Sequence, residues 1–322
     1  MRWAANGMLL TLVLAAGGCG TQDLILGAEG GYLFTGYDTL ALPGETVQVR
    51  ARVQAGDFLR AQPGLVVRFY EGGRLYRAAE TDSNGVASVS YTPPAPGDTV
   101  LRAELSPIGL GQVPPGPIEI LVACRQASAS MAVVDMDKTL VASGFDQVLV
   151  GDPAPMPDSI RVMKRLAERS SIVYLTHRPE YFGPKSQRWL QDHDYPRGPV
   201  LLSTVGGFLK GSEEYKTEAI RRLRERFQAL RIGIGDKVGD ALAYRASGLR
   251  AFLILQVPGG DDPEKVEALA DDLARLPADV EVVTGWAEVE RGLFNEAKFP
   301  PPIMVNKLRV LADQLRRHKG GG

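Results

Sequence analysis

The hydrophobic pattern of this chain changes near residue 130, and that change constrains the fold more than any other feature. Between residues 31 and 123, apolar residues alternate with polar ones, for example at Val47, Val49, Ala51 and Val53. Alternation of this kind is typical of strands that bury one face. From residue 131 onward, short apolar runs are separated by stretches with helical spacing. Such a succession forms parallel sheets covered by helices on both faces. The sequence therefore predicts an all-β domain followed by an α/β domain.

Composition indicates where the domains of this 322-residue chain begin and end. The first domain resembles the immunoglobulin-like domains of bacterial envelope proteins, and residues 81–91 resemble one of their hairpins. We expect a signal peptide (1–18), an immunoglobulin-like β-sandwich (24–124), a linker (125–130), an α/β domain (131–297) and a tail with an amphipathic helix (298–322). We interpret the sandwich as a spacer in preference to a ligand-binding module. Acidic and basic residues nearly balance, so nucleic acid is not an expected partner.

The α/β part can be divided into expected elements. Apolar runs predict strands at 131–134, 171–175, 200–202, 231–234, 251–255 and 280–283. Helical stripes fall between them, and Pro157 and Pro263 suit first-turn positions, whereas Gly248 suits a helix end. The tail has a stripe of its own at Val305, Leu308, Leu311 and Leu315. Such a stripe can bind a membrane surface or pack on its own domain, and we favour packing.

The first residues resemble a secretory signal. A short apolar run from Met8 to Ala16 is followed by Gly17, Gly18 and Cys19, a sequence similar to the bacterial lipobox. We therefore expect Cys19 to be acylated and the protein to be lipid-anchored in a bacterial cell envelope. The alternative is a plain signal peptide with an incidental Cys19. In that case a Cys19–Cys124 disulfide is conceivable, whereas acylation leaves Cys124 as a buried free thiol.

Polar residues follow several of the expected strands. Asp135 and Asp137 come directly after the apolar run at 131–134, with a threonine two residues further on. The carboxyl edge of a parallel sheet is where open α/β folds bind ligands. Two carboxylates placed there repel each other unless a cation lies between them, and a hard divalent cation suits oxygen ligands. A nucleophilic carboxylate beside a second carboxyl group is also suited to phosphoryl transfer.

Five further residues complete this candidate site. Thr176 and Arg178 follow the second strand and can bind phosphoryl oxygens. Lys216 lies near the start of a helix, where it can neutralise phosphate and carboxylate together. Asp236 ends a later strand and Asp240 enters the next helix, so both can face one metal ion. Each residue has a plainer interpretation, such as a solvated side chain or a helix N-cap. Their order along the chain favours the functional one.

This order resembles the haloacid dehalogenase superfamily of phosphotransferases, over residues 130–294. Within it, the T-H-R segment at 176–178, the Glu214–Glu218 helix start and the residues 235–244 resemble the catalytic domain of lipins, which are Mg-dependent phosphatidate phosphatases. Two positions depart from lipins: Lys138 stands where Gly is usual, and Asp236 where Asn is usual. The resemblance implies a parallel three-layer fold without a large cap.

The resemblance also implies a role for each residue. Asp135 would attack phosphorus, and Asp137 would act as the acid and then as the base. Thr176, Arg178 and Lys216 would bind phosphate. Mg²⁺ would be bound by Asp135, by Asp137 through its main-chain carbonyl, by Asp236 and by Asp240.

Three functions remain open at this point. The favoured one is an envelope phosphatase acting on phosphatidate or another lipid phosphate, since a site without a cap admits bulky substrates. The second is a phosphomonoesterase for soluble phosphate esters or nucleic-acid ends. The third is a catalytically inert surface binding or adhesion protein. The sequence predicts neither the oligomeric state nor a partner of the sandwich.

Overall fold

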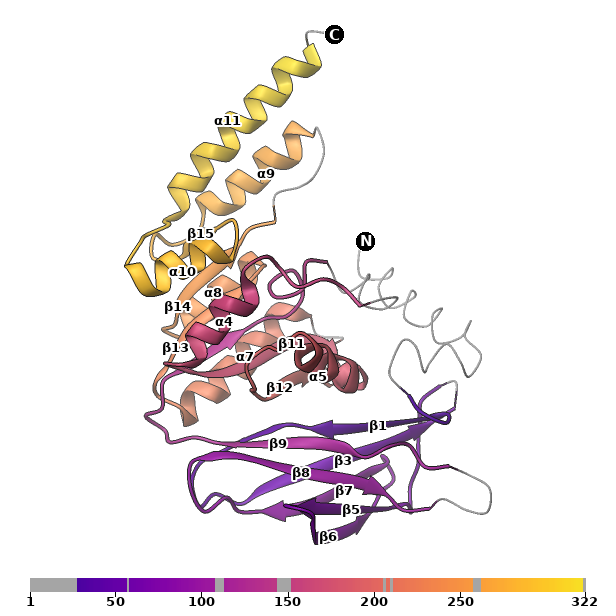
Figure 1. Ribbon diagram of the computed structural model, residues 1–322. Helices are drawn as coiled ribbons and strands as arrows, with labels where there is room; N and C mark the ends of the chain where they lie inside the picture. Colours follow the sequence, from indigo (N-terminus) through magenta and orange to yellow (C-terminus); the bar gives the residue numbers. More distant parts are fainter. Residues whose placement is uncertain are drawn as a thin grey trace.

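The computed structural model describes residues 28–56, 58–107, 113–143, 152–204, 207–208, 211–256 and 262–320, with an all-β part and an α/β part (Figure 1). The signal peptide and Cys19 lie outside these residues. Within the described part of the chain, no helix combines the length and the apolar character needed to cross a membrane.

The all-β part consists of two sheets packed face to face. In the first, β3 pairs with β1, β4 and β7, and the second has the order β2-β9-β8-β5-β6. The strands are β1 (Tyr32–Tyr37), β2 (Thr39–Ala41), β3 (Val47–Ala55), β4 (Arg60–Ala61), β5 (Val66–Glu71), β6 (Arg74–Glu80), β7 (Val86–Tyr91), β8 (Gly97–Leu105) and β9 (Ile118–Cys124). Together they form the predicted β-sandwich.

Alternating residues fill the sandwich core, as the sequence pattern predicted. Val49, Ala51 and Val53 of β3 are buried, and their neighbours Gln48 and Arg50 are exposed. The hairpin prediction for residues 81–91 is wrong. Strand β6 pairs with β5 in one sheet, and β7 pairs with β3 in the other. The chain therefore crosses between the sheets at this turn, and a sequence turn signal does not distinguish a crossing from a hairpin.

The α/β part is built on a six-stranded parallel sheet of order β12-β11-β10-β13-β14-β15. Its strands are β10 (Met131–Val134), β11 (Ser171–Pro179), β12 (Val200–Ser203), β13 (Leu230–Gly235), β14 (Arg250–Ile254) and β15 (Glu281–Val283). All six lie where the apolar runs predicted strands. From β10 the chain first builds outward to β12 and then returns to add β13 on the other side. The strand order therefore reverses between β10 and β13, where α/β folds bind ligands.

Helices cover both faces of this sheet (Figure 1). They are α4 (Ser159–Ala167), α5 (Gly183–Asp192), α7 (Ser212–Arg226), α8 (Val238–Ala246), α9 (Pro263–Ala274), α10 (Trp286–Asn295) and α11 (Pro301–Gly320), with a 3₁₀ turn η1 (Glu180–Phe182) before α5. One hydrophobic cluster joins the sheet to α7, α8, α9 and α11, and a second joins it to α4, α5 and α10. No separate cap domain is present among the described residues.

Helix ends agree with the sequence in two of three cases. Pro263 is the first residue of α9, and Gly248 has the left-handed φ of 75° just after α8. The prediction for Pro157 is wrong, because α4 begins two residues later, after Asp158 in a left-handed conformation.

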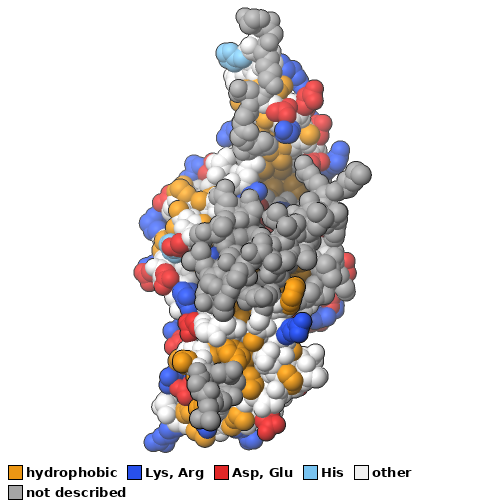
Figure 2. Space-filling view, turned by 90° about the vertical axis from the view of Figure 1, so that its right-hand side faces the viewer, with side chains coloured by type: hydrophobic (Ala, Val, Ile, Leu, Met, Phe, Trp, Pro, Cys, Tyr) orange, Lys and Arg blue, Asp and Glu red, His pale blue; other side chains and the backbone are white. Residues whose placement is uncertain are grey.

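The tail helix α11 packs on its own domain. Met304, Val305, Leu308 and Ala312 are buried against α9. Acidic and basic side chains are interspersed at the end of the molecule where α9 and α11 lie (Figure 2), and Arg309 pairs with Asp271 there. The favoured interpretation of the tail stripe is confirmed.

The two parts share a hydrophobic core across their junction. Ile120 and Val122 of β9 face the sandwich interior, whereas Leu121 and Ala123 belong to the cluster that covers the parallel sheet. Strand β9 is therefore buried on both faces. Cys124, at its end, is a buried free thiol.

Polar contacts hold the same junction. Asp38 accepts hydrogen bonds from the backbone N–H groups of Leu121 (2.9 Å) and Val200 (3.0 Å), one from each part. Burial raises the pKa of this carboxyl to about 6 despite these bonds. Arg52 of β3 forms an ion pair of 2.6 Å with Glu180 of η1. The sandwich is thus fixed to the segment that follows β11.

Candidate active site

Two acids occupy the point where the strand order reverses. Asp135 follows β10 and Asp236 follows β13, and these neighbouring strands end at the same edge of the sheet. The Asp135 backbone N–H donates to the carbonyl of Ile234 at 2.9 Å, which continues the pairing of the two strands. The local reason is the apolar sequence of both strands, which buries them and leaves the first polar residue at the edge.

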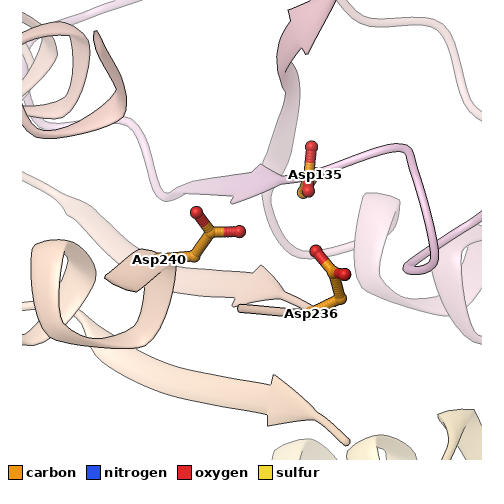
Figure 3. Close-up of side chains that lie close together, drawn as sticks. All are labelled: Asp135, Asp236 and Asp240. Atoms are coloured by element: carbon orange, nitrogen blue, oxygen red, sulfur yellow. The ribbon is translucent and has the colours of Figure 1, made fainter. Parts of the chain in front are cut away.

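A third acid, Asp240, approaches from α8 (Figure 3). Carboxylate oxygens of Asp135, Asp236 and Asp240 lie within 4.8 Å of one another. Gly235 makes this approach possible, because a Cβ there would lie only 2.9 Å from Asp240 Oδ2. The structure thus brings Asp135 together with two acids that lie far beyond it in the sequence.

Lys216 of α7 lies between two of these acids. Its Nζ is 2.8 Å from Asp135 Oδ2 and 2.7 Å from Asp240 Oδ2, and its side chain is only 1% exposed. Burial alone would lower the pKa of Lys216, but the two carboxylates hold it well above its ordinary value. The lysine is therefore a buried cation, as the sequence predicted for a charge-neutralising residue.

Asp236 lies in a buried environment that is dominated by the negative charges of Asp135 and Asp240. Burial and the charges of Asp135 and Asp240 raise its pKa to about 7. Within the described residues, Asp236 Oδ1 and Asp240 Oδ1 are buried and have no hydrogen-bond partner. Buried polar atoms are nearly always partnered, so these two oxygens could accept a bond from a metal ion or a water molecule. An all-carboxylate set of oxygen ligands fits a hard divalent cation such as Mg²⁺.

Asp137 and Arg178 form a second charged contact beside the triad. Arg178 Nη2 lies 2.7 Å from Asp137 Oδ1, and Nε lies 3.2 and 3.1 Å from Oδ1 and Oδ2. The guanidinium is 2% exposed. Phosphate binding by Arg178 stays a prediction, and in this structure its donors are directed at Asp137 and Ser186.

Thr176 is fully buried inside β11, one residue beyond the predicted strand end. Its hydroxyl oxygen accepts from the backbone N–H of Arg178 at 3.2 Å, which leaves the hydroxyl hydrogen to be donated elsewhere.

Lys138 has a left-handed φ of 54°, a conformation that glycine adopts without strain. This is the position at which the resemblance to lipins would place Gly.

Two groups near the site were not identified from the sequence. Ser186 of α5 is fully buried and accepts from Arg178 Nη1 at 3.0 Å. His177 stacks on Phe208 at 4.9 Å between ring centroids and lies 5.8 Å from the ring of Tyr215. Burial, together with Lys237 and Lys216, lowers the pKa of His177. The T-H-R segment pointed to His177, whereas nothing in the local sequence marked Ser186.

A comparison with protein families found a match within the α/β part. Residues 132–257 match the LNS2 domain of PITM 1-3. The LNS2 domain is a lipin-like domain with a haloacid dehalogenase-like fold, so the predicted fold of this part is confirmed. The matched residues include Asp135, Thr176, Lys216, Asp236 and Asp240. A search of curated proteins found no match.

Solved structures resemble about three tenths of the chain. They include the D00-D0 domain of Intimin (21% identity, 29% of this chain, 46% of that one, TM-score 0.23), a CARDB domain from Pyrococcus furiosus (18%, 29%, 91%, 0.21) and the titin M3 domain (10%, 30%, 97%, 0.22). The chain spans about half the length of the Intimin fragments. The description of the sandwich therefore rests on the strand pairing in this chain.

Proposed function

We propose that the protein is a metal-dependent phosphatase that hydrolyses a phosphate monoester through an aspartyl-phosphate. One observation carries the proposal: Asp135, Asp236 and Asp240 converge around a buried Lys216 at the point where the strand order reverses. The LNS2 match supports the same reaction class. The buried, unpartnered oxygens of Asp236 and Asp240 support a metal-binding role for this cluster.

The proposed reaction has two displacements at phosphorus. In the first, a carboxylate oxygen of Asp135 forms a bond to phosphorus as the bond to the ester oxygen breaks. Asp137 gives its proton to the departing alcohol. In the second, Asp137 takes a proton from water as that water attacks phosphorus, and the aspartyl bond breaks to release phosphate. Thr176 would donate its hydroxyl hydrogen to a phosphoryl oxygen, and Lys216 would offset the charge that develops.

The metal fits the same set of residues. Asp135, Asp236 and Asp240 would hold Mg²⁺ through carboxylate oxygens, with the main-chain carbonyl of Asp137 as a further ligand. The bound ion supplies neutralisation of charge on the phosphoryl group. Asp240 also contacts Lys216 through Oδ2, so its unpartnered Oδ1 is the oxygen available to a metal or its water.

We infer that the substrate is a lipid phosphate, phosphatidate being the simplest. Two observations support this class: the site edge carries no separate cap among the described residues, and residues 132–257 match a lipin-like domain. Soluble phosphate esters are the alternative substrates, and a catalytically inert binding protein is the alternative function.

A substrate panel on the full chain tests the proposal. Phosphate release is measured from vesicles containing phosphatidate and from soluble sugar and nucleotide monoesters, with Mg²⁺ or with EDTA. We expect Mg-dependent release from the vesicles, loss of activity in Asp135→Asn, and normal activity in Asp271→Asn, which changes an exposed acid of α9. Preference for soluble esters overturns the lipid substrate, and no release from any ester supports the inert binding protein.

We also propose that the chain is anchored in a cell envelope through acylated Cys19. The support is the lipobox-like sequence before it. In a bacterial host, Cys19→Ser should move the protein from the membrane fraction to the soluble fraction. Unchanged membrane retention would show that another feature anchors the protein.

A further inference from the structure

The buried guanidinium group of Arg178 forms a forked hydrogen-bonded ion pair with the Asp137 carboxylate. Three of its contacts, at 2.7 to 3.2 Å, reach the Asp137 carboxylate, and a fourth reaches Ser186 Oγ at 3.0 Å. Arginine stays protonated in proteins, and a buried cation is costly unless it is paired. The pair therefore has one favoured geometry. Such a two-point contact fixes the plane of the carboxylate as well as its position.

The two carboxylate oxygens of Asp137 accept different numbers of hydrogen bonds from Arg178. Oδ1 accepts from both Nε and Nη2, whereas Oδ2 accepts from Nε alone, at 3.1 Å. Oδ2 therefore keeps more of its lone-pair capacity. It is the oxygen left to exchange a proton with a leaving group or a water molecule. The Asp137 side chain is 21% exposed, so the carboxylate is not closed off from solvent.

Ser186 belongs to a helix that contacts the sandwich. Gly183, one turn earlier in α5, lies against Thr35 of β1, where an added Cβ would approach the threonine methyl to 3.2 Å. Gln187 of the same helix lies beside Asp38 in the pocket between the two parts. Just before the helix, Glu180 pairs with Arg52. One face of this segment is thus fixed to the sandwich, while Ser186 reaches the charged pair.

We propose that Arg178 is a positioning residue for Asp137, and that the sandwich sets this position through η1 and α5. The contacts run from the sandwich to the acid in three steps. Arg52 pairs with Glu180, α5 follows Glu180 and carries Ser186, and Ser186 contacts Arg178, which pairs with Asp137. This inference rests on the proposed phosphatase function, in which Asp137 transfers the proton. It assigns the sandwich a part in catalysis beyond that of a spacer.

Leaving-group dependence provides the kinetic test. A nitrophenolate departs without a proton, whereas an alkoxide needs one from Asp137, so a misplaced acid slows alkyl esters selectively. We expect Ser186→Ala and Arg178→Lys to lower the single-turnover rate of alcohol release from an alkyl phosphate about tenfold, with little change for nitrophenyl phosphate and in KM. Arg52→Met should produce a smaller selective loss. Arg68→Met, an exposed arginine of β5, should produce none.

Equal losses on both esters, or no loss in Ser186→Ala, would overturn the positioning role. Because Arg178→Lys removes a buried charge partner and can impair folding, Ser186→Ala is the deciding variant.

A second readout does not depend on activity. The Nε–H proton of Arg178 should be protected from solvent exchange in the NMR spectrum of the wild type, and Ser186→Ala and Asp137→Asn should weaken that protection. An unprotected proton in the wild type overturns the contact even if the protein is active. Absence of phosphate release with the proton protected overturns the proposed function and leaves the contact standing.

Discussion

Replacing Lys216 with methionine tests the electrostatics of the site most directly. The side chains of Lys216, Asp135 and Asp240 are 1%, 4% and 1% exposed, and the two ion pairs are 2.8 and 2.7 Å long. Methionine keeps much of the length and apolar volume of lysine but removes the charge. Three carboxylates within 4.8 Å of one another would then lack their buried cation.

The magnitude follows from the burial of this cluster. Removing one partner of a buried ion pair costs about 3–5 kcal/mol, because the remaining charge stays desolvated. For a protein of this length, 1 kcal/mol shifts the melting temperature by about 1.5 °C, so we expect a loss of about 5–8 °C. Added Mg²⁺ should recover part of it, since a bound cation stabilises the native state and replaces the missing charge.

Calorimetry of the full chain in EDTA and in Mg²⁺ measures both effects. Arg221→Met is the matched control, because Arg221 also lies on α7 but forms exposed ion pairs with Glu218 and Glu225. Exposed pairs contribute little, so this variant should melt close to the wild type. If Lys216→Met melts like Arg221→Met in EDTA, the buried cation does not hold these acids together and the reasoning is refuted.

Three other outcomes are expected. Asp236→Ala should raise the Mg²⁺ concentration for half-maximal phosphate release at least about tenfold, a loss of about 1.4 kcal/mol in binding, and Asp279→Ala should not. Gly233→Ala should destabilise the fold by about 1–3 kcal/mol in urea unfolding, because its Cβ would lie 2.2 Å from the Tyr244 ring, whereas Gly285→Ala meets no atom within 4 Å. Since burial raises the pKa of Asp38 to about 6, the folded protein binds this proton better than the unfolded chain does. Stability should therefore fall by about 3 kcal/mol as pH rises from about 4 to about 6. The fall should be smaller by this amount in Asp38→Asn, where the contribution of the raised pKa of Asp236 remains. An equal fall in both proteins would contradict the role of Asp38.

Local patterns predicted most of the α/β part. Each strand of the parallel sheet is a short apolar run, and its burial on both faces requires such a run. The positions of Asp135 and Asp236 followed from the same rule, because carboxyl ends of parallel strands share one edge, whereas Asp240 approaches that edge from α8. The metal-binding interpretation depended only on this edge and on residue type.

Contacts that depend on tertiary packing were not predictable. The pairing of Arg178 with Asp137 requires β11 and the loop after β10 to approach side by side, and the sequence offered phosphate binding as an equally natural role for an arginine. Ser186 lies on α5, a helix that contacts β1 of the sandwich. The turn at 81–85 has the composition of a hairpin turn, yet the strands around it enter different sheets.

The sequence of strand β9 contains a pattern that predicts burial on both faces. Ile120 to Cys124 is apolar without interruption, whereas β3 and β7 alternate. An unbroken run indicates a strand covered on both sides. The spacer interpretation of the sandwich ignored this.

A strand with two covered faces means that the protein cannot be divided at residue 125. A fragment starting there would lose Leu40, Leu121 and Ala123, which form one wall of the larger hydrophobic cluster beneath the sheet. A shortened variant for crystallisation or screening should therefore retain the sandwich. Without it, the apolar surface beneath the sheet would be exposed to solvent, and we expect the fragment to aggregate.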